Sequence, residues 1–107
     1  MDTQRKQHIP GRLTVGALHA RLDPYQRAYL ASVRVELREV DWHEGRAVLV
    51  VVPAGVGVAK LSLCNDSEAE AFIELIDESA EMGWRELGFS HRLTKLAEEL
   101  FVSRRGL

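Results

Sequence analysis

The sequence contains a single cysteine, Cys64, so the chain cannot form an internal disulfide. No apolar run approaches the roughly 18–20 residues that a membrane-spanning helix needs. Residues 1–12 contain no apolar segment, which excludes a secretory signal. Together these absences predict a cytoplasmic protein in a reducing compartment.

Lysine and arginine are absent from residues 66–83, which carry seven acidic side chains. The 107-residue chain has a net charge of −2, but that charge is unevenly distributed. Residues 1–65 sum to +3, residues 66–83 to −7 and residues 84–107 to +2. The length is that of one domain with one hydrophobic core. The sequence therefore predicts an acidic element on an otherwise mildly basic domain.

The acidic stretch from Asp66 to Met82 is predicted to be an amphipathic helix. Its apolar residues recur at helical spacing: Ala69, Phe72, Ile73, Ile76 and Ala80. Asp66 or Ser67 is expected to cap the helix, with Glu70 completing a capping box if Ser67 is the cap, while Gly83 ends the run. The opposite face is predicted to carry an acidic strip made of Glu70, Glu74, Asp77, Glu78 and Glu81.

The N-terminal part is predicted to hold a flexible basic arm, residues 1–12, followed by a single domain, residues 13–107. A short helix is expected from Thr14 to about Leu22. A second helix is expected over residues 24–32, because Asp23 is a favoured cap and proline suits the first helical position. This second helix is predicted to bury Tyr25, Ala28 and Tyr29.

Three strands are predicted between the helices. Residues 33–40 alternate between apolar and charged side chains, which indicates a half-buried strand. Residues 47–52 are continuously apolar, which predicts the central strand of a sheet covered on both sides, and residues 56–64 give a third strand. Short links make this sheet an antiparallel meander. The fold class is therefore α+β.

Two further elements are expected after the acidic helix. Residues 84–89 fit either a short fourth strand or an irregular link. Ser90 is then predicted to cap a final helix that Gly106 closes.

The sequence shows no cofactor or metal motif, and we predict that the protein is not an enzyme. Residues 55–60, GVGVAK, lack the Gly-Lys-Ser/Thr end of a phosphate-binding loop and are expected to form a hairpin turn. The four histidines have no partner at a metal-ligand spacing. Cys64 is expected to be a small buried side chain without an activating base.

Two segments resemble DNA-binding sequences. Residues 93–105, LTKLAEELFVSRR, resemble the first helix and turn of the helix-turn-helix family. Residues 14–30 resemble two helices of a winged-helix domain, with residues 43–46 as the tip of the wing. That resemblance implies DNA binding in which Gln26, Arg27 and Ser32 face the duplex. The order of helix, meander and helix is also similar to the double-stranded RNA-binding domain, but an acidic second helix would repel phosphate.

These patterns support two functional hypotheses. The first is a non-catalytic regulatory protein whose acidic strip engages a basic surface of another protein. Homodimerisation through an exposed edge strand such as residues 33–40 is also plausible. The alternative is a nucleic-acid-binding regulator, with contacts from Arg5, Lys6, Arg12, Arg21, Gln26 and Arg27. If the acidic strip instead faces only solvent, its role is to keep the protein soluble.

Overall fold

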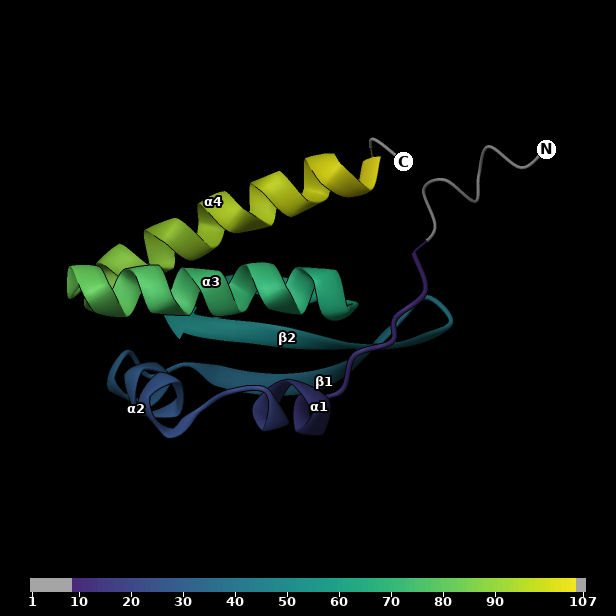
Figure 1. Ribbon diagram of the computed structural model, residues 1–107. Coiled ribbons are helices and arrows are strands. Elements are labelled where there is room, and N and C mark those ends of the chain that lie inside the picture. The colour runs from purple at the N-terminus through teal and green to yellow at the C-terminus, as the bar shows by residue number, and fades with distance from the viewer. Residues whose placement is uncertain (1–8, 106–107) are drawn as a thin grey trace.

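A computed structural model describes residues 9–105 of the chain (Figure 1). Their elements, in chain order, are α1 (Val15–Ala20), α2 (Pro24–Ser32), β1 (Glu36–Trp42), β2 (Gly45–Pro53), β3 (Val58–Leu63), α3 (Asp66–Met82) and α4 (Glu86–Arg105). The strands form one antiparallel sheet in the order β1-β2-β3. The predicted α+β class and three-stranded meander are confirmed.

The core lies between one face of the sheet and a single layer of helices. Val48, Val50 and Val52 of the central strand are fully buried in this core, together with Phe72 of α3 and Phe89 of α4. Along the helical layer, α2 packs against α3 and α3 packs against α4. Figure 1 shows α3 and α4 beside each other. Because the helices contact one another in this order, they share one face of the sheet.

Polar contacts hold the helical layer together across α2, α3 and α4. The Tyr29 hydroxyl of α2 donates a hydrogen bond of 2.7 Å to the carbonyl of Trp84, between α3 and α4. The Tyr29 ring also meets the Phe89 ring edge to face, with centroids 5.6 Å apart. Burial raises the pKa of Tyr29 above its ordinary value. The tyrosine is therefore a neutral donor that links three helices.

The ends of α1, α2 and α3 follow local sequence signals, with one correction. Thr14 caps α1, and Asp23 forms a reciprocal capping box at the start of α2, as predicted. For α3 the prediction was wrong, since Asn65 is the cap and its side chain accepts from the backbone N–H of Glu68. Gly83 ends α3 with φ 72°, a left-handed conformation that glycine adopts without steric cost.

The first strand begins later than predicted. Arg34 has φ 62°, which breaks the extended run, so β1 starts at Glu36 rather than at residue 33. Residues 84–89 contain no strand, because α4 already begins at Glu86 and the backbone N–H of Phe89 bonds to the carbonyl of Arg85 at 2.8 Å. Ser90 therefore lies inside α4 and is not its cap. The predicted terminator, Gly106, lies outside the described residues.

Helix α2 turns a different face to the core than its sequence predicted. It buries Gln26 and Leu30, while Tyr25 is 68% exposed. Ala28 is exposed and Tyr29 is half-buried. The capping box explains this rotation, since Gln26 must turn inward to accept the backbone N–H of Asp23.

The described end of the predicted arm, residues 9–12, is hydrogen-bonded to the sheet. The backbone N–H of Arg12 donates to the carbonyl of Cys64 at 2.7 Å, and that of Arg46 donates to the carbonyl of Gly11 at 3.1 Å. A Cβ on Gly45 would lie 1.8 Å from the Gly11 carbonyl oxygen. A glycine at the start of β2 is therefore what lets this segment approach the hairpin.

Candidate functional site

The acidic strip on α3 is partly neutralised by other elements of the chain. Glu70 accepts a hydrogen bond from Arg21, which also lies 3.7 Å from Asp66. Glu78 pairs with Arg92 of α4 at 3.1 Å. The absence of basic residues within α3 therefore does not leave these carboxylates uncompensated, because arginines distant in sequence fold back onto the helix.

The remaining members of the strip differ from one another. Asp77 accepts a hydrogen bond of 2.9 Å from the Gln26 amide, a neutral donor that leaves the charge in place. Glu74 and Glu81 are exposed and have no hydrogen bond or ion pair with residues 9–105. The net negative charge of the strip is therefore concentrated on the last three turns of α3.

A shallow groove of about 210 Å³ runs between α3 and α4. Its lining combines apolar and charged side chains: Ala71, Glu74, Leu75, Glu78, Arg92, Lys95, Leu96 and Glu99. Of its carboxylates, Glu78 is paired, whereas Glu74 and Glu99 have no ion pair within residues 9–105. The α3–α4 groove thus presents one acid without an ion pair from each of its helices, and the unpaired cation Lys95, beside an apolar floor.

The residues proposed for nucleic-acid contact do not form one exposed basic surface in the described chain. Arg5 and Lys6 lie outside the described residues. Gln26 is 8% exposed and is held by Asp23 and Asp77, so its predicted role in facing DNA is wrong.

The three remaining arginines of that set differ in their surroundings. Arg21 is bound to acids of α3. Arg27 donates to the carbonyl of His19 at 3.0 Å, and the exposed Arg12 belongs to the segment docked on the sheet. Of the described arginines in this set, Arg12 and Arg27 are therefore the two that have no acidic partner among residues 9–105.

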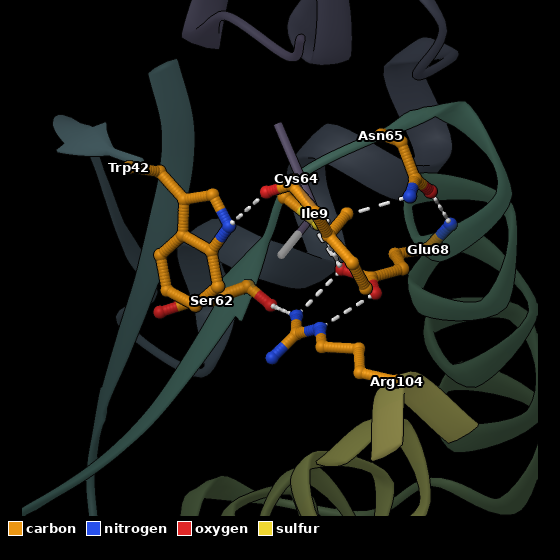
Figure 2. Close-up of polar contacts among 7 residues, drawn as sticks. All are labelled: Ile9, Trp42, Ser62, Cys64, Asn65, Glu68 and Arg104. Atoms are coloured by element: carbon orange, nitrogen blue, oxygen red, sulfur yellow. Dashed lines mark hydrogen bonds and ion pairs between the residues drawn. The ribbon is translucent and has the colours of Figure 1, made fainter. Parts of the chain in front are cut away.

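A buried ion pair, which the sequence did not predict, ties the end of α4 to β3 and α3 (Figure 2). Arg104 donates to both carboxylate oxygens of Glu68, from Nε at 2.8 Å and from Nη2 at 2.6 Å. Nη2 also donates to the carbonyl of Ser62 at 2.7 Å. The two side chains are 17% and 8% exposed, and such two-pronged pairs are among the stronger charge-assisted contacts.

Cys64 is a hydrogen-bond donor in this cluster. Its backbone N–H and its Sγ lie 3.0 and 3.2 Å from Oε1 of Glu68. Burial, and then the hydrogen bond and charge of Glu68, raise the pKa of the thiol to about 11, against a smaller lowering by Arg104. A thiol that stays protonated at neutral pH is a poor nucleophile.

Glu68 keeps its charge despite its burial. Burial is the largest single influence and raises its pKa, but hydrogen bonds from Arg104 and from the backbone and thiol of Cys64 lower it. The net pKa lies below the ordinary value. The same contacts raise the pKa of Arg104, so both partners are ionised at neutral pH.

Trp42 of β1 extends this cluster to the N-terminal segment. Its indole N–H donates to the carbonyl of Ile9 at 3.0 Å, and the Arg104 guanidinium lies 5.0 Å from the ring centroid (Figure 2). Because Glu68 and Arg104 are 36 residues apart, no local pattern could reveal their pairing. The cluster joins five segments, the N-terminal segment, β1, β3, α3 and α4, and is a structural clasp.

Comparisons of this chain with protein-family models, with curated proteins and with solved structures found no match. Within residues 9–105, no helix has the length and hydropathy needed to cross a bilayer. The same part of the chain holds no group of three or more His, Cys, Asp or Glu side chains arranged to bind a metal ion.

Proposed function

We propose that this protein is a non-catalytic interaction protein whose α3–α4 groove binds a basic segment of another protein. The observation that carries the proposal is the placement of unpaired carboxylates on both sides of an apolar floor. Glu74 comes from α3 and Glu99 from α4, and neither is neutralised by a described residue. Glu81 extends the same negative charge along α3.

The groove matches the chemistry of a lysine or arginine side chain. Such side chains lay their aliphatic stems on apolar surface and keep the charged head in a polar setting. Leu75 and Leu96 offer the apolar contact, and the two carboxylates offer the counter-charge. Arg92 competes little, since it pairs with Glu78 and lies 5.1 Å from the Trp84 ring centroid.

Nucleic-acid binding is less well supported. An acidic groove repels phosphate, and phosphate contacts supply most of the affinity of nucleic-acid-binding proteins. With Gln26 buried and Arg21 bound to Glu70, α1 and α2 offer few cations to a duplex.

Fluorescence anisotropy with labelled amphipathic peptides tests this proposal. A lysine/leucine peptide should bind at low salt, and a glutamate/leucine peptide of the same length should not. Replacing Glu74→Gln and Glu99→Gln together should weaken binding about three- to tenfold, as expected for two partly exposed charge contacts. Glu44→Gln, in the hairpin turn, is the matched control and should leave the affinity unchanged. Equal binding by the double variant would refute the proposal.

A further inference from the structure

A second groove, of about 340 Å³, lies between α1, α2 and β1. We call it the α1–α2 groove. Apart from His19 and Arg27, the side chains that line it are apolar, and they include Leu22, Leu30 and Leu37. It shares no lining residue with the α3–α4 groove, so what it binds is independent of the proposed function.

The floor of the α1–α2 groove is the edge of the hydrophobic core at β1. Leu37 points to the same side of the sheet as Val50, its partner on β2. Val50 is fully buried, whereas Leu37 is only partly buried. Val15 and Val35 are also partly buried and pack against the core. The described helices therefore leave apolar side chains of α1 and of the region around β1 accessible in this groove.

Arg27 gives the groove a cation that has no acidic partner among residues 9–105. Its Nη2 donates to the carbonyl of His19 at 3.0 Å, which holds the guanidinium against α1. A guanidinium has five N–H donors, and this contact uses one of them. The exposed Arg27 side chain therefore keeps donors for a ligand in the groove.

The acids closest to the groove along the chain are bound elsewhere. Asp23, one helical turn before Arg27, caps α2. Glu39 accepts the backbone N–H of Val15 at 3.0 Å and lies 3.7 Å from Arg46. As far as residues 9–105 form the lining, it contains no acidic side chain. The α1–α2 groove is therefore an apolar site with a positive charge.

We propose that the α1–α2 groove binds a small carboxylic acid with an apolar tail. The carboxylate lies against Arg27, because a guanidinium matches the planar geometry of a carboxylate. The imidazole of His19 offers a further N–H donor, and the tail covers Leu37 and its apolar neighbours. Small-molecule sites have volumes of about 300–1,000 Å³ and combine an apolar lining with a few polar groups. Since this groove is at the small end of that range, a ten-carbon acid should bind with a dissociation constant of about 0.1–3 mM.

An NMR titration of the isotope-labelled chain with decanoate tests this inference. Saturable shifts of the backbone amide signals should be confined to α1, α2 and the start of β1. Decylamine has the same tail and the opposite charge at neutral pH, and it should bind about fivefold more weakly. Shifts centred on the α3–α4 groove would overturn the proposal, as would the absence of saturable shifts up to about 10 mM decanoate.

Reversing the charge of Arg27 distinguishes an ionic site from a merely apolar surface. Arg27→Glu should weaken decanoate binding about tenfold and should make decylamine the tighter ligand. Lys60→Glu is the matched control, since it changes the net charge equally at an exposed residue of β3 outside the groove. It should change neither affinity by more than about twofold. Circular dichroism verifies that both variants fold. Arg27→Glu that still prefers decanoate would overturn the proposal, as would Lys60→Glu with the same effect as Arg27→Glu.

Discussion

Removing the charged head of Arg104 tests the claim that the Glu68 clasp stabilises the fold. Arg104→Met keeps most of the aliphatic stem over Trp42 but deletes both hydrogen bonds to Glu68 and the one to Ser62. A hydrogen bond to a charged group contributes about 1.5–3 kcal/mol, and a buried carboxylate that loses its partner is strongly destabilising.

The sum of these free-energy costs overstates the effect here. Glu68 keeps its contacts with Cys64, and water can enter beside the partly exposed Arg104 position. We therefore expect the variant to lose about 2–3 kcal/mol of unfolding free energy. For a domain of this size the midpoint of thermal unfolding should fall by about 10–15 °C. Urea denaturation followed by circular dichroism at pH 7 measures the loss.

The loss of unfolding free energy in Arg104→Met should also depend on pH. The folded pKa of Glu68 is below its unfolded value, so the stabilisation is present at neutral pH and is lost as the pH falls through the folded pKa. In Arg104→Met, burial acts on Glu68 without the opposing guanidinium, and protonation at acid pH relieves that cost. The difference between the two proteins should therefore shrink below about pH 4.

Arg105→Met is the matched control, because Arg105 is an exposed neighbour whose only described contact is with the Phe101 ring, 5.5 Å from its centroid. It should cost less than about 0.5 kcal/mol. A cost for Arg104→Met no larger than this, or a difference that persists unchanged at pH 3, would refute the assignment of a stabilising ion pair.

Three further predictions follow from backbone packing and thiol chemistry. Gly45→Ala should destabilise the fold by about 1–3 kcal/mol in urea denaturation, because its Cβ would meet the Gly11 carbonyl oxygen at 1.8 Å. Gly16→Ala should instead stabilise it by about 0.5–1 kcal/mol, since Gly16 lies within α1 with nothing within 4 Å of a new Cβ. Cys64 should react with a thiol reagent at pH 7.5 far more slowly in the folded chain than in urea, because it is buried and its pKa is raised to about 11; equal rates would contradict its burial.

Local patterns were sufficient to predict most of the secondary structure. The capping box at Asp23, the left-handed Gly83, the alternation in β1 and the apolar run of β2 depend on residues within a few positions of one another. The start of α4 was missed because Gly88 has low helix propensity. The tertiary fold places Gly88 against Trp84, where a Cβ would approach to 3.3 Å, so the small residue suits a crowded first turn.

Contacts between distant segments explain what the sequence did not predict. The pattern of α2 indicated a buried Tyr25, but the reciprocal cap and the hydrogen bond to Asp77 turn Gln26 inward instead. The continuous apolar run of β2 predicted cover on both sides of the sheet, and this was wrong, because the buried residues of the described helices cluster with Val48, Val50 and Val52 of one face. The packing of α2 on α3 and of α3 on α4 places the helices of residues 9–105 mainly on the other side of the sheet from Val51.

The acidic helix shows why the charge of a segment does not measure the charge of a surface. Its seven acids come without one basic residue, yet arginines from α1 and α4 reach Glu68, Glu70 and Glu78. These three acids therefore form ion pairs that hold the helical layer and the end of the sheet together. The acidic side chains of α3 that can still bind a partner are those that no described arginine reaches. Glu74, in the groove, is one of them. An interaction through α3 must depend on that residual charge.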